Sequence, residues 1–375
     1  MPDRHITVMS PLLPPREELD RLFDEIWRSR IVTNQGVFHD RLEAELSSHL
    51  NVPALSLVAN GTAALICAIR ALGITGEVIT TPYSFVATAH AIHFCGLKPV
   101  FVDIDPVTCN LDPSKIEAAI TSETSAILPV HVYGVPCDTE RIGEIAKNHD
   151  LKVIYDAAHA FGVEKFGRSI LQSGDISTLS FHATKVYNTV EGGAVICNNS
   201  ILQKQIAYFR NFGFEDETSV VMPGVNAKMD ELRAAYGLVN LRYVKQAIEK
   251  RRALTYRYRE LLADIPGISF MHEMQGIKYN YAYFPIFIDV GLLGITRDQL
   301  YELLKSSGIY CRRYFYPLIT SFEPYNRAVS AQASNLPVAI SKADSVLCLP
   351  LHQELTLDDI GYIVKAIKGE IAVLF

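Results

Sequence analysis

Lys185 stands in a setting where an amine could act as a nucleophile. It follows a short apolar run at 176–181 and precedes two glycines and a second apolar run, so the sequence predicts a turn between two strands. A lysine among apolar neighbours has a lowered pKa, and its uncharged amine can form a Schiff base with a carbonyl compound. The alternative is a solvated lysine in a surface hairpin turn.

Upstream, an aspartate ends another apolar run. Residues 153–155 predict a buried strand, Asp156 stands at its carboxyl end, and His159 follows three residues later. A carboxylate beside the pyridine nitrogen of pyridoxal 5'-phosphate (PLP) keeps that nitrogen protonated, so that the ring can act as an electron sink. Asp156 and Lys185 together therefore predict a PLP site, with Lys185 as the catalytic residue.

A third stretch suits the phosphate of that cofactor. Residues 54–58 predict a strand, which leads through Asn60, Gly61 and Thr62 into an Ala-rich helix. A helix N-terminus offers unpaired N–H groups and the positive end of the helix dipole to an anion. We predict that these three residues bind the phosphate. Taken alone, Thr62 could instead be only the N-cap of the helix.

The order of the predicted elements indicates an α/β fold. Short apolar runs alternate with helical segments, which predicts a mainly parallel sheet covered by helices on both faces. We expect a large domain at 1–240 that includes an N-terminal helix, and a smaller α+β domain at 241–375. A long connecting helix is predicted at about 238–265 and a shorter helix at 112–121.

In such sheets ligands bind beyond the carboxyl ends of the strands. The predicted elements place several candidate residues there: Asn60, Phe85, Asp156, His159 and Ser180. Asp103 and Asp105 are spaced like metal ligands, but no other carboxylate or histidine stands at a suitable interval. We therefore interpret this acidic pair as loop and cap residues and predict no metal site.

Composition and charge exclude several classes of protein. The chain has 375 residues, 49% hydrophobic residues and a formal net charge of −6 without a basic block, so no nucleic-acid partner is expected. No run is long and apolar enough to predict a membrane span, and the N-terminus lacks the apolar core of a signal peptide. Seven cysteines without CxxC pairs suit a reducing compartment, so we predict a cytoplasmic protein.

Three motifs resemble the DegT/DnrJ/EryC1/StrS family. They are Asp-Ala-Ala-His at 156–159, Ser-Phe-His-Ala-Thr-Lys at 180–185 and Glu-Gly-Gly-Ala at 191–194. The resemblance implies PLP fold type I, of the aspartate-aminotransferase kind. It also implies transfer of an amino group from L-glutamate to a keto sugar that is linked to a nucleotide.

The resemblance assigns roles to single residues. Phe85 matches an aromatic residue that stacks on the cofactor ring, although an ordinary core position is the alternative. His159 matches the contact to the phenolic oxygen of the cofactor, and Ser180 a contact to its phosphate. Asn226 matches a residue that reaches the phosphate in the neighbouring subunit, which implies a homodimer with shared active sites. Lys228 stands where an arginine is expected, so no substrate role is assigned there.

Contacts to the substrate are harder to place. The turn at 33–36 could stand at the mouth of the site or only join two helices, and His182 could be structural or face the substrate. A cationic and aromatic loop at 313–318 matches the family loosely. The candidate substrate contacts are Thr33, Asn34, His182, Tyr187, Tyr314 and Tyr316.

Within the family, the stretch 180–193 is most similar to enzymes that aminate C4 of dTDP-4-dehydro-6-deoxy-D-glucose to give dTDP-4-amino-4,6-dideoxy-D-glucose, a sugar of O-antigen lipopolysaccharide. The alternatives are a C3-aminotransferase, an enzyme for UDP- or GDP-linked keto sugars, and a PLP-binding regulator without turnover. Family members that catalyse dehydration have histidine in place of the lysine, and Lys185 argues against them. No GxGxxG follows the first strand, which argues against a Rossmann-type oxidoreductase.

Overall fold

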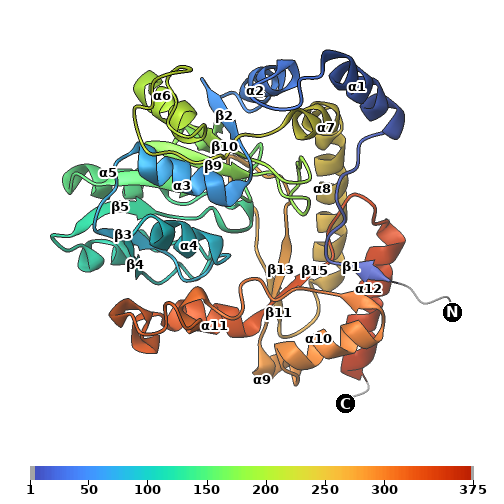
Figure 1. Ribbon diagram of the computed structural model, residues 1–375. Coiled ribbons are helices and arrows are strands. Elements are labelled where there is room, and N and C mark those ends of the chain that lie inside the picture. Colours follow the sequence, from blue (N-terminus) through green and yellow to red (C-terminus); the bar gives the residue numbers. More distant parts are fainter. Residues whose placement is uncertain (1–4, 373–375) are drawn as a thin grey trace.

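The computed structural model describes residues 5–372 (Figure 1). One region is built on a large sheet, at the upper left of Figure 1. A second, C-terminal region lies below it, and helix α8 (Val244–Leu262) runs from one to the other. Within residues 5–372, no helix has both the length and the apolar content needed to cross a bilayer.

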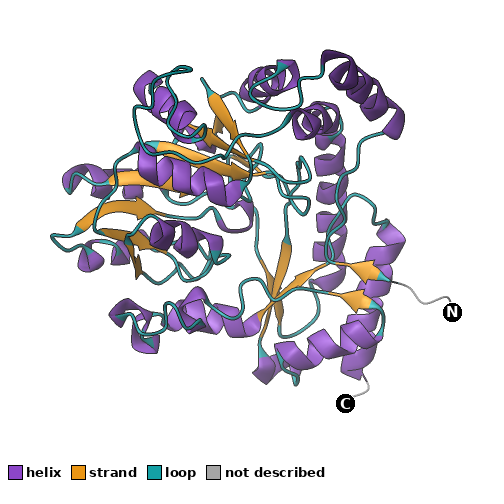
Figure 2. Ribbon diagram, in the orientation of Figure 1, coloured by secondary structure: helices purple, strands orange, loops and turns teal. Residues whose placement is uncertain are grey.

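Figure 2 distinguishes the helices and strands of both regions. The helices that accompany the large sheet are α1 (Arg16–Ser29), α2 (Val37–His49), α3 (Gly61–Ala71), α4 (Ala87–Phe94), α5 (Thr139–Asn148), α6 (Ser200–Phe209) and α7 (Glu231–Leu241). Those of the C-terminal region are α9 (Val290–Leu293), α10 (Arg297–Ser306), α11 (Pro337–Ser345) and α12 (Leu357–Ala372). The large sheet consists of β2 (Leu55–Val58), β3 (Glu77–Thr80), β4 (Lys98–Phe101), β5 (Thr124–Leu128), β6 (Lys152–Asp156), β9 (Ile176–Ser180) and β10 (Gly193–Ile196).

The large sheet has seven strands in the order β2-β10-β9-β6-β5-β3-β4. Strand β10 pairs antiparallel with both of its neighbours, and every other pair in the sheet is parallel. The predicted α/β fold with a mainly parallel sheet is therefore confirmed.

Both faces of this sheet are covered, as alternation along β6 shows. Ile154 packs in one core with Ala64 and Ala68 of α3, whereas Val153 and Tyr155 pack in another core with α5. Successive side chains of a strand point to opposite faces, so one apolar run serves two cores. This explains why the strands are continuously apolar rather than alternating in polarity.

The parallel arrangement brings the carboxyl ends of the strands to one edge. Asp156 is the last residue of β6 and Ser180 the last residue of β9, and these two strands are parallel neighbours. Strand β2 runs in the same direction and leads through Asn60 into α3. Residues that the sequence separates by more than a hundred positions thus meet at one edge of the sheet.

The C-terminal region has its own core around an antiparallel sheet. Strands β11 (Ile268–Phe270), β13 (Phe284–Ile288) and β15 (Val346–Leu349) form this sheet, and α8 and α12 pack on it. The first described strand, β1 (Ile6–Thr7), pairs with β14 (Ile309–Tyr310). The start of the chain therefore joins the C-terminal region rather than the large domain predicted for it, and the boundary at 240 stays a prediction.

A second three-stranded sheet joins the two regions. It consists of β7 (Glu164–Lys165), β8 (Arg168–Ser169) and β12 (Ile277–Lys278), in the order β12-β7-β8. Because β12 belongs to the segment that precedes β13, this pairing anchors that segment beside the large sheet.

Two predicted helices differ in the structure. The stretch 112–121 forms two short 3₁₀ turns, Pro113–Lys115 and Glu117–Ala119, because only one of its apolar side chains, Ile116, is fully buried and so few contacts support a longer helix. The helix predicted at 238–265 is broken between α7 and α8. At the break the side chains of Arg242 and Tyr243 both bind Glu18 of α1.

The acidic pair that resembled metal ligands has the predicted capping role. Asp103 accepts hydrogen bonds from the N–H groups of Val338 (3.2 Å) and Ala339 (2.8 Å) at the start of α11. Asp105 accepts from the N–H group of Thr108 (2.7 Å) in its own loop. Asp103 thereby ties α11 to the large sheet.

Candidate active site

A cavity of about 670 Å³ opens at the carboxyl edge of the large sheet. Ten of the residues that the sequence analysis proposed line it. They are Asn60, Gly61, Thr62, Phe85, Asp156, His159, Ser180, His182, Lys185 and Tyr314. These residues come from five separate stretches of the chain, so one cavity brings together the groups that the sequence only suggested.

Lys185 lies in the turn after β9, and its side chain is half-buried at the cavity. Its N–H group donates to the carbonyl of His182 (2.8 Å), which closes the turn that presents it. Burial lowers the pKa of Lys185 to about 8, although the carboxylate of Asp156 acts in the opposite direction. The reading as a solvated surface lysine is therefore wrong, because close to neutral pH part of this amine is uncharged.

Asp156 is buried with both of its oxygens engaged. One oxygen accepts from the N–H group of Ala158 (3.1 Å) and the other from the hydroxyl of Thr88 (2.9 Å). Burial raises its pKa in spite of these two hydrogen bonds. A cationic group in the cavity would favour the ionised carboxylate, and a protonated pyridine nitrogen is such a group.

His159 is a buried neutral imidazole with a defined tautomer. Its Nδ1 accepts a hydrogen bond from the N–H group of Tyr133 (3.2 Å), so the ring carries its proton on Nε2. Burial, together with the charge of Lys185, keeps its pKa well below the usual range. The ring stacks on Phe315 at 5.7 Å between centroids. His159 is therefore a hydrogen-bond donor, as an anionic phenolic oxygen requires.

The start of α3 forms an anion cradle. The side chain of Asn60 accepts from the N–H group of Ala63 (2.8 Å), so Asn60 and not Thr62 is the N-cap. A Cβ atom on Gly61 would lie 2.8 Å from the Cβ atom of Ser180. Only glycine therefore lets the first turn of α3 lie against the end of β9, where helix N–H groups and the hydroxyl of Ser180 can bind one phosphate.

Phe85 does not occupy an ordinary core position. Its side chain is 61% exposed, although it lines the cavity between β3 and α4. A large aromatic side chain exposed inside a cavity is available to stack on a flat ligand. Stacking on the cofactor stays a prediction.

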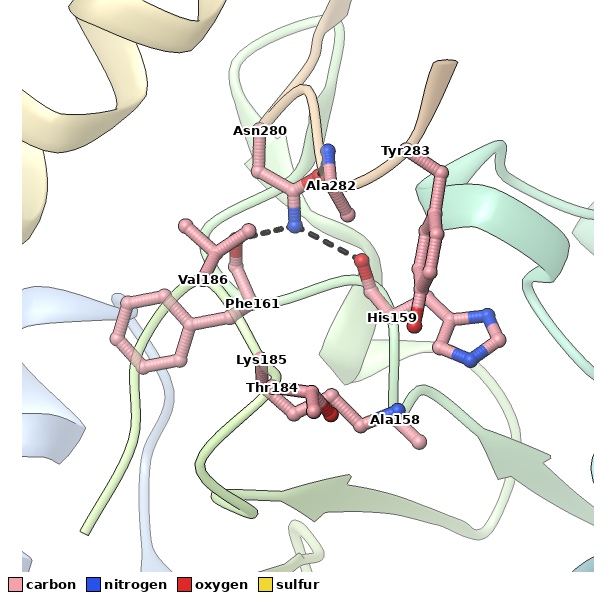
Figure 3. Close-up of a pocket in the computed structure, with 9 residues that line it drawn as sticks. All are labelled: Ala158, His159, Phe161, Thr184, Lys185, Val186, Asn280, Ala282 and Tyr283. Atoms are coloured by element: carbon pink, nitrogen blue, oxygen red, sulfur yellow. Dashed lines mark hydrogen bonds between the residues drawn. The ribbon is translucent and has the colours of Figure 1, made fainter. Parts of the chain in front are cut away.

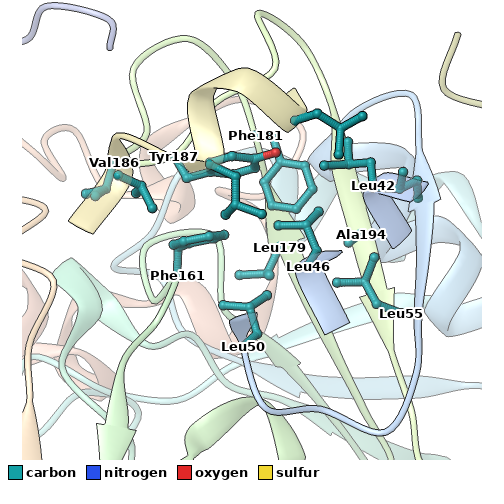
Figure 4. Packing of buried hydrophobic residues seen from close by; sticks show 14 of the residues in the cluster. Leu42, Leu46, Leu50, Leu55, Phe161, Leu179, Phe181, Val186, Tyr187 and Ala194 are labelled. Carbon is teal, nitrogen blue, oxygen red and sulfur yellow. The ribbon is translucent and has the colours of Figure 1, made fainter. Parts of the chain in front are cut away.

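Tyr187 is a correction to the predicted substrate contacts. It is fully buried between Phe161 (4.6 Å between ring centroids) and Phe181 (5.0 Å), in the core cluster of Figure 4. Lys185 and Tyr187 are two positions apart in an irregular turn. Lys185 lines the cavity, whereas Tyr187 lies in the hydrophobic core. Neither helical nor strand periodicity applies there, so the sequence could not show on which side each residue lies.

Four further candidates do not line the cavity of their own chain. Thr33, Asn34 and Asn226 are exposed elsewhere, and the backbone of Asn226 pairs with that of Asn211. Tyr316 is exposed and its ring lies 4.3 Å from the guanidinium of Arg297. A contact between Asn226 and the site of a second subunit stays a prediction.

The sequence analysis missed several residues of the cavity walls. Thr88, which binds Asp156, and Glu191, whose carboxylate lies 3.7 Å from His182, come from stretches that were already under consideration. Asn280 and Tyr283 come from the C-terminal region and line a smaller pocket with Lys185 (Figure 3). No short motif marks these last two, because only the tertiary fold brings them to the site.

Within residues 5–372, one group of side chains has the spacing of metal ligands. It consists of His39, Asp40 and Glu43 in α2. The same Glu43 oxygen that faces His39 accepts from Arg210 (2.7 Å) and from the N–H group of Leu57 (2.8 Å). This carboxylate is therefore already paired with a cation and serves to fasten α2 to the sheet.

Comparison with known proteins agrees with this geometry. Residues 15–368 match the DegT/DnrJ/EryC1/StrS aminotransferase family. The chain belongs to this family. It is 48% identical to a dTDP-4-amino-4,6-dideoxy-D-glucose transaminase of Shigella dysenteriae, over 98% of this chain and 99% of that protein. A protein of the same name from Escherichia coli is 47% identical over 99% of this chain and 100% of its own length.

A solved structure shows the same fold. The crystal structure of DesI in the presence of its TDP-sugar product has a TM-score of 0.94 and 36% sequence identity, and the match covers 98% of this chain and 93% of that one. The protein is thus a PLP-dependent sugar aminotransferase. The described residues fit that cofactor: an amine of lowered pKa, a buried carboxylate, a histidine donor and an anion cradle share one cavity.

Proposed function

We propose that the protein transfers an amino group from L-glutamate to C4 of dTDP-4-dehydro-6-deoxy-D-glucose, giving dTDP-4-amino-4,6-dideoxy-D-glucose for a lipopolysaccharide O-antigen. The observation that carries the chemistry is the half-buried amine of Lys185, whose pKa is lowered to about 8, in one cavity with buried Asp156. The names of the two relatives at 47–48% identity support the choice of sugar and nucleotide. Unpaired cysteines support a reducing, cytoplasmic location.

The residues that would hold the cofactor would contact different chemical groups of it. Asp156 would keep a proton on the pyridine nitrogen, and His159 would donate from Nε2 to the phenolic oxygen. Ser180 and the residues Asn60–Thr62 bind the phosphate, while Phe85 covers a face of the ring. When bound, PLP supplies an electron sink that stabilises negative charge at the carbon being deprotonated.

Lys185 performs the proton transfers. Its amine would hold the cofactor, and its Nζ would act as a general base toward the α-carbon of L-glutamate. The same Nζ returns a proton in that half-reaction, and the roles reverse for the sugar. A pKa of about 8 lies close to the working pH, which is where one group can serve both as acid and as base.

The first experiment separates turnover from binding. Purified protein loaded with PLP is mixed with L-glutamate and then with single keto sugars linked to dTDP, UDP or GDP. We expect glutamate to bleach the cofactor colour with release of 2-oxoglutarate, and the dTDP-linked 4-keto sugar to restore it with an amine at C4 by NMR. Colour that glutamate does not change would identify a PLP-binding regulator, and an amine at C3 would overturn the assigned carbon.

The proposal includes a homodimer in which Asn226 completes the site of the partner subunit. The loop that carries Asn226 exposes apolar side chains to solvent: Phe212 is 48% exposed, Val220 60% and Val221 50%. Exposed apolar patches of this kind mark surfaces that bind another protein. Light scattering should therefore give twice the mass of the 41.7 kDa chain.

Mixed dimers test whether the sites are shared. Lys185→Ala and Asn226→Ala each damage both sites of their own homodimer. If Asn226 acts across the interface, a mixed dimer contains one site with both residues intact, and mixing should restore up to about a quarter of wild-type activity. Mixtures no more active than the separate variants would show that Asn226 does not act across subunits.

A further inference from the structure

The segment Asn280–Tyr283 enters the active site from the C-terminal region and is held there by hydrogen bonds. The Asn280 side chain donates to the carbonyl groups of His159 (2.8 Å) and Phe161 (3.0 Å), as the dashed lines in Figure 3 show. Its own oxygen accepts from the N–H group of Ala282 (3.1 Å). Asn280 therefore fixes the segment to the same stretch of chain that carries His159.

A buried arginine holds the other side of this segment. Arg251 of α8 is 1% exposed, and its guanidinium donates to the carbonyl groups of Leu351 (2.8 Å) and Ala282 (3.4 Å). Both backbone groups of Ala282 are therefore held: its N–H group donates to the Asn280 side chain, and its carbonyl accepts from Arg251. The backbone that carries the side chain of residue 283 is therefore rigid.

Tyr283 is the side chain that this segment presents. Its ring stands edge-on to His159 (4.9 Å between centroids) and perpendicular to Tyr314 (5.8 Å). It lines the large cavity and also the smaller pocket behind Lys185, and in Figure 3 its hydroxyl is directed into that pocket. These ring contacts fix the orientation of the phenol at the edge of the cavity.

The hydroxyl of Tyr283 differs from those of the neighbouring phenols. Tyr83 and Tyr133 bond to each other (2.7 Å), and Tyr133 also donates to the carbonyl of Tyr314. For Tyr283, no hydrogen-bond partner exists among residues 5–372, and its side chain is only partly buried. A phenol held rigidly at a ligand cavity with an unused donor is a candidate contact for the substrate.

We propose that the Tyr283 hydroxyl donates a hydrogen bond to the keto oxygen of the sugar and orients that carbonyl toward Lys185. The inference rests on the proposed aminotransferase function. A neutral donor suits a neutral carbonyl oxygen, and Tyr283 with Tyr314 and Phe315 forms an aromatic wall that suits the apolar face of a pyranose ring. Burial raises the pKa of Tyr283, so the hydroxyl keeps its proton at neutral pH.

The sugar and the amino donor need different side chains for their recognition. L-Glutamate carries two carboxylates, for which proteins commonly use arginine. Among the described residues that line the cavity there is no arginine, and Tyr283 adds no positive charge. The hydroxyl of Tyr283 should therefore serve the keto-sugar half-reaction and not the glutamate half-reaction.

The test is Tyr283→Phe, which removes one oxygen and keeps the ring. The two half-reactions are measured separately by the absorbance of the bound cofactor, with the keto sugar that the wild-type protein accepts. We expect kcat/KM for the keto sugar to fall by roughly 100- to 1,000-fold, as for loss of one hydrogen-bond donor to a reacting oxygen. The rate with L-glutamate, the dissociation constant for PLP and the pH dependence of the cofactor absorbance should stay unchanged.

Tyr187→Phe is the matched control, because it also removes a hydroxyl that has no partner but lies in the core. It should leave both half-reactions unchanged. Equal slowing of both half-reactions by Tyr283→Phe, a changed cofactor spectrum, or no slowing of either would overturn the role of Tyr283. A wild-type protein that exchanges with glutamate and accepts no keto sugar would instead overturn the proposed function.

Discussion

The two sides of the active-site cavity are built in different ways. The cofactor side consists of the ends of adjacent parallel strands, so that Asp156 and Ser180 are placed by the topology of the sheet itself. The opposite side consists of Asn280 and Tyr283, which reach the cavity through hydrogen bonds to residues as far as 121 positions away. The first side carries the groups that fit the cofactor, and the second carries Tyr283, which we propose contacts the sugar.

This contrast predicts different outcomes when each side is damaged. Loss of a group on the cofactor side should remove the chemistry for every substrate and leave the fold intact. Loss of a restraint on the opposite side should reduce stability and weaken binding of one substrate. The four predictions below test this difference, beginning with the largest expected effect.

Asp156→Asn tests the cofactor side. The amide has nearly the shape of the carboxylate, and its oxygen can still accept from the N–H group of Ala158 while its NH2 group faces the Thr88 hydroxyl, but it cannot hold a proton on the pyridine nitrogen. We expect kcat for both half-reactions to fall on the order of 10²- to 10⁴-fold, with little change in the thermal unfolding midpoint. Stopped-flow absorbance of the bound cofactor measures the rates of both half-reactions. A variant with near-normal kcat would show that the buried acid does not assist the ring.

Asn280→Ala tests the opposite side. It removes two buried hydrogen bonds to carbonyl groups, which leaves those groups unpaired and should lower the free energy of unfolding by about 1–3 kcal/mol. KM for the keto sugar should rise while the rate with L-glutamate stays closer to normal. Urea unfolding and half-reaction kinetics provide the measurements.

The control for that variant is Asn335→Ala, which removes a single exposed hydrogen bond to the carbonyl of Val329. Its effect on stability should stay within about 0.5 kcal/mol. Equal losses of stability for the two variants would mean that the buried bonds of Asn280 do not anchor the cavity wall.

The lowered pKa of Lys185 predicts a pH effect on the stability of the cofactor-free protein. Between about pH 8 and the ordinary lysine pKa of 10.5, the unfolded chain binds the proton of this lysine and the folded chain does not. Stability therefore rises with pH across this window, relative to a protein without the group. The unfolding midpoint of the wild type minus that of Lys185→Ala should increase from pH 8 to pH 10. A constant difference would contradict a lowered pKa.

Tyr187→Phe should have the smallest effect. The hydroxyl is buried without a partner, so its removal relieves an unpaired polar group and leaves the ring packing with Phe161 and Phe181 unchanged. Stability should be equal to that of the wild type or higher by up to about 1 kcal/mol, and both half-reactions should keep their rates. A specific loss with the keto sugar would return Tyr187 to the substrate contacts.

The same contrast explains how far the sequence could be interpreted. Asp156, Lys185 and the turn at Asn60 were predictable, because each residue stands at a fixed offset from a strand end and the parallel order brings those ends together. The role of Asp103 as a capping residue followed from the lack of further ligands nearby. In all these cases a local pattern determined the position.

Where local patterns are weak, the sequence led to a wrong prediction or to no prediction. Tyr187 lies in a turn without periodicity, and 112–121 has helical spacing but buries only Ile116 fully. Asn280 binds backbone carbonyl groups, which every residue has, so no residue type marks its partners. Tyr283 acquires its position only through Asn280 and Arg251, and such tertiary restraints leave no short-range signal.

The most direct test of the account is the site of cofactor attachment. The PLP-loaded protein is treated with borohydride, which converts a Schiff base into a stable secondary amine, and the labelled peptide is identified by mass spectrometry. We predict one adduct per chain on Lys185 and none in Lys185→Ala. An adduct on a different lysine, with Lys185 unmodified, would contradict the assignment on which the proposed function depends.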